Sequence, residues 1–312
     1  MACAIQVSNV WISQNHHLGF TDLIRYNNQW VCAFRRGASH MSLDSQLIIL
    51  VSDDAKIWRL KWQLTWQGGD LRDPKLSITP NHQLLLTAGI RWAVPLSINT
   101  AISSVGYLLE KGGFPEPVLD ATSEGTWRWA PTWHQGVAYS VGYAGKDKTG
   151  CLYQSCDGLH WQRWVKPFFM TPEGLSNEAT LAFAGNRAYC LLRRDKKEGV
   201  NALLGESAFP FKEWQWQETN QSLGGPKLLH LSSGQWIAGF REIDYEKQTA
   251  CMLLKKLNPK TAQFSDWITL PSSGDCSYPG LVEYDGHLLV SYYSSHEDQV
   301  SIYLADIELI RN

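Results

Sequence analysis

Six segments of this chain repeat one pattern, in which a strand, a tight turn and a second strand follow one another. Aligned on their turns, the segments end at positions separated by 54, 54, 50, 48 and 52 residues. A repeat of this length, filled by short alternating strands, is typical of a β-propeller in which each repeat forms one four-stranded blade. We therefore predict one all-β domain over residues 1–312, a six-bladed β-propeller. The six segments are TDLIRYNNQWVCAFR, KLSITPNHQLLLTAG, WAPTWHQGVAYSVGY, ATLAFAGNRAYCLLR, KLLHLSSGQWIAGFR and PGLVEYDGHLLVSYY.

The ends of the chain indicate how the ring closes. The first segment is followed by LIILVSDD and LKWQLTW, a third and a fourth strand, and each later blade can be divided in the same way. The last segment is followed by only one further strand, VSIYLADI, whereas AIQVSNVWI (residues 4–12) precedes the first blade. We predict that this N-terminal strand completes the sixth blade, because closure removes exposed sheet edges.

Composition narrows the class of protein. Hydrophobic residues make up 44% of the chain and charged residues 19%, which is enough apolar material for a packed core. The net charge of -2 argues against nucleic acid or an anionic membrane as a partner, since both select basic surfaces. The seven cysteines lack metal-ligand spacing, and no secretory signal opens the sequence. We therefore expect free thiols, no cofactor and a cytoplasmic location; a removed signal would make the protein periplasmic or secreted.

Two turns share the spacing S-x-D-x-x-x-W, one over Ser52–Trp58 and one over Ser155–Trp161. An aspartate in such a turn accepts backbone N–H hydrogen bonds while the tryptophan packs beneath it. We predict that both turns stabilise their blades. They resemble the Asp-box, or BNR repeat, of sialidases and other propellers.

One face of the predicted ring gathers ionisable side chains. The start of a blade's first strand and the end of its second strand lie on the same face, and in this alignment they are 15 residues apart. The second strands end at Arg35, Gly89, Tyr143, Arg193, Arg241 and Tyr293, and the first strands begin at or beside Phe20, Pro74, Arg128, Glu178, Pro226 and Tyr278. His40, Asp70, Arg72 and Asp73 are close to these positions in the sequence.

Arginines that converge on one point predict an anionic ligand, because guanidinium groups stay charged and make forked hydrogen bonds to carboxylates. Phosphate or sulfate would satisfy them equally. The predicted binding residues are Arg35, Arg193 and Arg241, together with Asp70, Arg72, Arg128 and Tyr293. No metal site is predicted, because the spacing of His16, His17, His40 and His296 matches no ligand set.

Two stretches on this face carry a family resemblance. SNEATL (residues 176–181), followed by CLLRR (residues 190–194), resembles the sialidase pattern in which a glutamate begins one strand and an arginine ends the next. CSYPGL (residues 276–281), followed by LLVSYY (residues 288–293), is similar to the segment that carries the sialidase nucleophile, a tyrosine. The chain most resembles bacterial sialidase-like propellers bearing DLRDPKLSITP, NEATL, LGGP, SYPGL and YYSSHE.

This resemblance implies a mechanism in which Glu178 takes the phenolic proton and Tyr278 attacks the anomeric carbon. The arginines would hold the carboxylate of the sugar. Sialidases place their first arginine in an F/Y-R-I-P motif, and here the corresponding residues 17–22 read HLGFTD, so Arg35 would substitute from the neighbouring strand. The catalytic acid of the family lies in the loop that follows, where this chain has His40 and Asp44, and Asp73 is the alternative acid.

The resemblance therefore implies an exo-acting glycoside hydrolase whose partner is a carbohydrate, sialic acid or a related 2-keto acid sugar. A second hypothesis is a glycosidase or lyase for another polysaccharide, which would use Asp73, His40 or Tyr278 differently. A third is a noncatalytic propeller that binds sugar or protein, since this fold carries many functions. The third hypothesis predicts that carboxylates such as Asp70, Asp73 and Glu242 neutralise the arginines.

Overall fold

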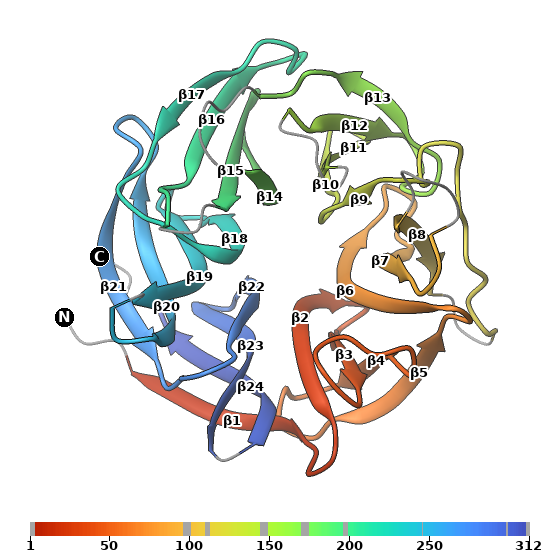
Figure 1. Ribbon diagram of the computed structural model, residues 1–312. Helices are drawn as coiled ribbons and strands as arrows, with labels where there is room; N and C mark the ends of the chain where they lie inside the picture. Colours follow the sequence, from red (N-terminus) through yellow and green to blue (C-terminus); the bar gives the residue numbers. More distant parts are fainter. Residues whose placement is uncertain are drawn as a thin grey trace.

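Six antiparallel sheets form a ring around a central axis (Figure 1). The computed structural model describes residues 4–95, 101–109, 113–143, 149–169, 175–195, 199–244, 246–297 and 299–309. Every regular element within these ranges is a β-strand. The prediction of an all-β, six-bladed propeller is confirmed. Because the described ranges hold no helix, none is available there to span a membrane. The six cysteines within these ranges are free thiols.

The strands follow one another blade by blade, from the axis outward. Blade 1 contains β2 (His17–Tyr26), β3 (Gln29–Gly37), β4 (Gln46–Ser52) and β5 (Arg59–Thr65). Blade 2 contains β6 (Gly69–Ile78), β7 (Leu84–Trp92) and β8 (Ile102–Leu108). Blade 3 contains β9 (Trp127–Arg128), β10 (Thr132–His134), β11 (Val137–Tyr143), β12 (Cys151–Ser155) and β13 (Gln162–Val165). Blade 4 contains β14 (Leu175–Ala184), β15 (Arg187–Asp195), β16 (Leu203–Ala208) and β17 (Gln215–Glu218). Blade 5 contains β18 (Gly224–His230), β19 (Trp236–Asp244), β20 (Thr249–Asn258) and β21 (Gln263–Leu270).

Blade 6 joins the two ends of the chain. It contains β22 (Ser277–Tyr284), β23 (His287–Glu297), β24 (Gln299–Glu308) and, outermost, β1 (Ile5–Ile12). The first strand pairs antiparallel with the last, so the two extremes of the colour scale lie side by side in Figure 1. The prediction that the N-terminal strand completes the sixth blade is confirmed.

Blade 2 departs from the predicted four strands, because its described part has only three. The segment at residues 113–126 covers β8 through two isolated bridges, Gly106 with Val118 and Ser103 with Glu124. This segment contains Pro115 and Pro117, which lack the N–H that a continuous ladder requires. The prediction of a fourth strand in this blade is wrong for that reason.

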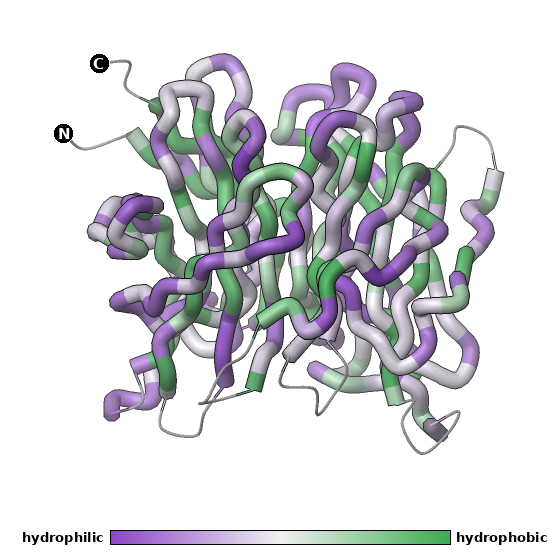
Figure 2. The backbone as a smooth tube through the Cα atoms, turned by 90° about the horizontal axis from the view of Figure 1, so that it is seen from above, coloured by the Kyte–Doolittle hydropathy of each residue, from purple (hydrophilic) through white to green (hydrophobic). Residues whose placement is uncertain are grey.

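The core lies between neighbouring blades. Buried apolar clusters join blade 1 to blade 2, blade 3 to blade 4 and blade 5 to blade 6, so each sheet is held by its neighbours. In the tube view, apolar stretches follow many of the strands and polar stretches occupy many of the loops (Figure 2). The two Asp turns form as expected: Asp54 in blade 1 accepts the backbone N–H groups of Lys56 and Ile57, and Asp157 in blade 3 accepts those of Leu159 and His160.

Five of the six inner strands are bulged near their first residues. The ladder shifts register between Gly19 and Asp22, Arg72 and Lys75, Ser176 and Ala179, Gly224 and Lys227, and Ser277 and Gly280. Each shift leaves two residues outside the ladder, and four of these residues have a positive φ, namely Phe20 (59°), Asp73 (50°), Gly225 (57°) and Tyr278 (50°). A bulge redirects the side chains that it carries. The same irregularity therefore shapes the mouth of the propeller on five sides.

Candidate active site

Glu178 and Tyr278 meet at the mouth of the propeller. Glu178 lies in the bulge of β14, and Tyr278 lies in the bulge of β22. The Tyr278 hydroxyl donates a hydrogen bond to Oε1 of Glu178. The other oxygen, Oε2, accepts hydrogen bonds from Nη1 of Arg193 at 2.6 Å and from the backbone N–H of Gly225 at 2.8 Å. Glu178 is buried, and these three donors orient its carboxylate.

The surroundings set opposite protonation states for this pair. Burial by itself raises the pKa of Glu178, but Arg193 and the hydrogen bond from Tyr278 outweigh it and bring the pKa below its ordinary value. Burial raises the pKa of Tyr278 well above its ordinary value, and the negative charges of Glu178 and Asp73 raise it further. The result is an ionised carboxylate beside a neutral phenol, the arrangement of a general base and a nucleophile.

Arg193 and Arg241 form a recess beside this pair. Each side chain is 18% exposed. A Cβ added to Gly224 would lie 3.2 Å from Nε of Arg241 and 3.6 Å from Nη1 of Arg193, so the two guanidinium groups flank the space that this glycine leaves open. Nε of Arg241 has no hydrogen-bond partner among the described residues. Both groups also border one small pocket with Ser222 and with Asp195, whose carboxylate accepts Nε of Arg193. Two guanidinium groups at one pocket can attract an anion the size of a carboxylate.

Arg35 does not reach this recess. Its side chain is fully buried, and Nε donates a hydrogen bond to Asp70 at 2.8 Å. Its other donors bind the Ser39 carbonyl and the Ser42 hydroxyl. The predictions that Arg35 and Asp70 contact a ligand are wrong for this structure. Both side chains are buried, and the guanidinium group of Arg35 binds the carboxylate of Asp70. Arg72 is also buried, and its Nη1 lies 3.3 Å from Oδ2 of Asp70. This contact holds Arg72 at the side of the site.

Two further predicted binding residues lie away from the opening. Tyr293 is fully buried, and its hydroxyl donates to Asp275 at 3.0 Å. Arg128 is buried beside Asp120 at 3.6 Å and donates to the Thr122 hydroxyl at 2.8 Å. Neither side chain is available for direct contact with a ligand in this structure, because neighbouring side chains occupy the polar groups of both.

Asp73 has the features of a catalytic acid. It lies in the bulge of β6, is 6% exposed, and its Oδ1 has no hydrogen-bond partner among the described residues. Burial raises its pKa from 3.8 to about 6, although Arg72 and Lys75 oppose this increase. The negative charge of Glu178 raises the pKa of Asp73 further. A buried carboxylic acid with a pKa of about 6 holds its proton below that pH and can then donate it to a leaving group.

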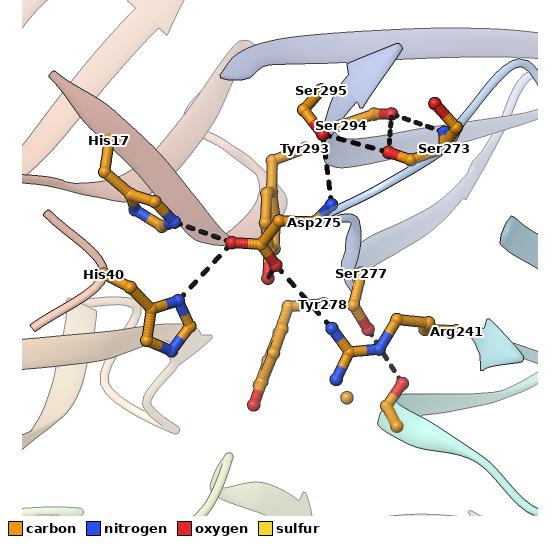
Figure 3. A network of polar contacts seen from close by, with 12 residues as sticks. His17, His40, Arg241, Ser273, Asp275, Ser277, Tyr278, Tyr293, Ser294 and Ser295 are labelled. Atoms are coloured by element: carbon orange, nitrogen blue, oxygen red, sulfur yellow. Dashed lines mark hydrogen bonds and ion pairs between the residues drawn. The ribbon is translucent and has the colours of Figure 1, made fainter. Parts of the chain in front are cut away.

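His40, the other predicted acid, belongs to a network around Asp275 (Figure 3). Oδ2 of Asp275 lies 2.7 Å from Nε2 of His17 and 3.4 Å from Nδ1 of His40. Oδ1 of Asp275 accepts the Tyr293 hydroxyl and lies 3.6 Å from Nη1 of Arg241. Burial opposes ionisation of Asp275, but its hydrogen bonds outweigh burial and hold its pKa well below the ordinary value.

The ligand atoms of His17, His40 and Asp275 lie within 4.8 Å of one another, close enough to share a metal ion. Two guanidinium groups surround them, since Nη2 of Arg72 is 3.4 Å from Nε2 of His40 and Arg241 lies against Asp275. An arginine donor at Nε2 leaves the proton of neutral His40 on Nδ1, the atom that faces Asp275. This arrangement favours a hydrogen-bonded carboxylate over a bound cation.

The sequence did not predict the contributions of Asp275, Asp195 and Lys75. Asp275 comes three residues before Tyr278, and Asp195 follows Arg193 by two residues and accepts its Nε at 2.7 Å. Their closeness in the sequence to predicted site residues could have identified both aspartates as candidates. Lys75 follows Asp73 by two residues, but only closure of the ring, which brings the inner strands β6 and β22 to the same axis, places it at the ring of Tyr278.

Comparison with known proteins establishes the fold. No family model matches the chain, and curated proteins give no match. A protein of unknown function from Dyadobacter fermentans has a TM-score of 0.83 at 18% identity, over 98% of this chain and 99% of that chain. Trypanosoma rangeli sialidase in complex with sialic acid has a TM-score of 0.70 at 12% identity, over 99% of this chain and 59% of that chain. A GH43 β-1,3-galactosidase with galactodeoxynojirimycin has a TM-score of 0.55 at 10% identity, over 82% of this chain and 96% of that chain.

At these identities the likeness extends to the architecture and no further. This chain has the propeller fold of sialidases and related glycosidases, and it spans less than two thirds of the length of the sialidase.

Proposed function

We propose that this protein is an exo-acting glycoside hydrolase of the sialidase type that cleaves a terminal acidic sugar, sialic acid or a related 2-keto acid sugar. The observation that carries the proposal is the position of Glu178, whose two oxygens bind the Tyr278 hydroxyl and the Arg193 guanidinium. A nucleophile, its base and an anion-binding group are thereby joined by consecutive hydrogen bonds.

This arrangement favours a sugar that carries a carboxylate on its anomeric carbon. Because Arg193 shares Glu178 with Tyr278, an anion in the recess beside Arg241 would lie next to the carbon that the phenol attacks. A 2-keto acid sugar has its carboxylate at that place. A neutral phenol also approaches such a carbon without the repulsion that a carboxylate nucleophile would meet.

The proposed reaction begins when the phenolic proton of Tyr278 moves to Glu178. The Tyr278 oxygen bonds to the anomeric carbon while the glycosidic carbon–oxygen bond breaks, and Asp73 protonates the departing oxygen. Asp73, now ionised, then takes a proton from water, and that water displaces Tyr278. The proton on Glu178 returns to the phenolate, so each group ends in its starting state.

The test is covalent trapping with a 2,3-difluoro acidic sugar, combined with hydrolysis of aryl glycosides. We expect release of the aryl group from an aryl α-sialoside or a related 2-keto acid glycoside, and a sugar adduct on the Tyr278 peptide in mass spectrometry. A wild-type protein that hydrolyses none of a panel of acidic aryl glycosides and carries no adduct would overturn the proposal.

One observation favours a second candidate, a glycosidase for a neutral sugar that uses two carboxylates. Asp73 is close enough to Glu178 for their charges to interact, and its raised pKa suits an acid. Arg241 is partly neutralised by Asp275, which weakens its hold on an anion. The same trapping experiment, with a neutral 2-fluoro sugar, would then label Glu178 or Asp73 instead of Tyr278.

A further inference from the structure

Lys75 is buried in the axial channel beneath the ring of Tyr278. It lies on β6, is 8% exposed, and its Nζ is 5.6 Å from the centre of the Tyr278 ring. The two residues border one cavity together with Glu178 and Lys227. Nζ donates a hydrogen bond to the carbonyl of Thr21 at 3.2 Å, which holds the ammonium group in this position.

The charge of Lys75 has no counter-ion at ion-pair distance among the described residues. The nearby carboxylate of Asp22 is already bound, by Nζ of Lys227 at 3.1 Å and by the backbone N–H of Leu76 at 2.8 Å. Burial lowers the pKa of Lys75, and the charge of Asp22 partly offsets this. The ring of Tyr278 is therefore the surface that this cation faces.

We propose that Lys75 is a positioning residue that acts through Tyr278, stabilising the phenolate that forms when the proton passes to Glu178. A cation facing an aromatic ring is attracted to it, and the attraction grows when the ring carries a full negative charge. Burial is the main obstacle to ionisation of Tyr278, and the charge of Arg193 opposes it, so a second positive charge at the face of the ring favours the phenolate further. The charged or titratable groups around its ring are Asp73, Lys75, Glu178, Arg193, Lys227, Arg241 and Tyr293.

The proton balance of the step is unchanged by Lys75, which neither gives nor takes a proton. The O–H bond of Tyr278 breaks, its proton joins Glu178, and the negative charge moves from the carboxylate to the phenol oxygen. Lys75 lowers the energy of that transferred charge. Its catalytic consequence rests on the proposed function, whereas its effect on the ionisation of Tyr278 does not.

The experiment separates charge from hydrogen bonding with three variants. Lys75→Gln keeps a donor for Thr21 without the charge, Lys75→Met removes both, and Lys75→Arg keeps both. Lys212→Gln is the matched control, since Lys212 is exposed and its Nζ faces the Trp164 ring at 4.1 Å, outside the site. Each protein is labelled with 3-fluorotyrosine and titrated by fluorine NMR, and the Tyr278 signal is identified by its loss in Tyr278→Phe.

We expect the apparent pKa of the labelled Tyr278 to rise by about 1 pH unit in Lys75→Gln and Lys75→Met, and to be unchanged in Lys75→Arg and Lys212→Gln. With an aryl substrate, kcat should fall about tenfold in the two uncharged variants while KM changes little. A Tyr278 titration that is the same in Lys75→Gln as in the wild type would overturn this inference. If the wild type hydrolyses no glycoside, the proposed function fails and the titration still decides the role of Lys75.

Discussion

The hydroxyl of Tyr278 donates a hydrogen bond to Glu178, although the two residues are 100 positions apart in the chain and belong to different blades. The contact depends on two bulges, one in β14 and one in β22, that turn both side chains toward the axis. Because Arg193 binds the same carboxylate, the pair is joined to the anion recess.

Removing the phenol oxygen should abolish turnover and leave the fold intact. We expect Tyr278→Phe to lower kcat by about 10³-fold or more, because Tyr278 supplies the hydroxyl that Glu178 binds among the described residues. Tyr284→Phe, at the exposed end of the same strand, should retain wild-type activity. The measurement is hydrolysis of an aryl 2-keto acid glycoside, with circular dichroism as a check of folding. Equal activity in both variants would remove Tyr278 from the reaction.

Asp73 should determine the alkaline limb of the activity profile. A catalytic acid must be protonated, so activity should decline as pH rises through about 6, the pKa of Asp73. Asp73→Asn should reduce hydrolysis of poor leaving groups by about 100-fold and should affect activated aryl leaving groups less. An unchanged pH profile in this variant would assign the acid to another group.

The same carboxyl should also make stability depend on pH. The folded state retains the Asp73 proton up to about pH 6, whereas the unfolded chain releases it near 3.8, so the free energy of unfolding falls as pH rises between these values. Asp73→Asn should therefore be more stable than the wild type at pH 8, by up to about 3 kcal/mol, and the difference should be smaller at pH 4. Urea denaturation at the two pH values measures it. A difference that does not vary with pH would contradict the assignment.

Filling the space between the two guanidinium groups should weaken anion binding selectively. In Gly224→Ala, the added methyl would lie 3.2 Å from Nε of Arg241. We expect the affinity for an acidic sugar analogue to fall about tenfold, a loss of about 1.4 kcal/mol, while binding of a neutral analogue is unchanged. Gly113→Ala is the control, because a Cβ there meets no atom within 4 Å. Calorimetry that finds equal losses for both analogues would show a general distortion instead of a blocked anion site.

Asp275 should contribute to stability above acidic pH. Its folded pKa is held well below the ordinary value of 3.8, so its contribution is present at neutral pH and is lost progressively as pH falls below about 4. Asp275→Asn should lower the free energy of unfolding by about 1–3 kcal/mol at pH 7, since His17 and Arg241 lose a charged acceptor. The difference in the free energy of unfolding between this variant and the wild type should become smaller as pH falls below about 4. Asp285→Asn, in an exposed hairpin turn, should match the wild type throughout the titration.

The propeller was predictable because its signals are local. Alternation with period two and turn residues at a spacing near fifty define each blade without knowledge of its neighbours, and the unpaired strand at residues 4–12 indicated how the ring closes. The same reasoning placed Glu178, Tyr278, Arg193 and Arg241 on one face. It did not predict that the described part of blade 2 has three strands, with isolated bridges in place of a fourth.

The sequence by itself therefore determined the ring and the face on which the site lies, since both follow from strand periodicity. Only the tertiary structure decided which arginine side chains are partly exposed at the site and which are fully buried. Arg35 and Arg241 occupy the same position in their repeats, at the end of the second strand. Arg35 is nevertheless buried against Asp70 of the next blade, whereas Arg241 is 18% exposed beside Gly224. The physical reason is that the environment of a side chain comes from neighbouring blades and from bulges, and neither is encoded in the period of its own strand.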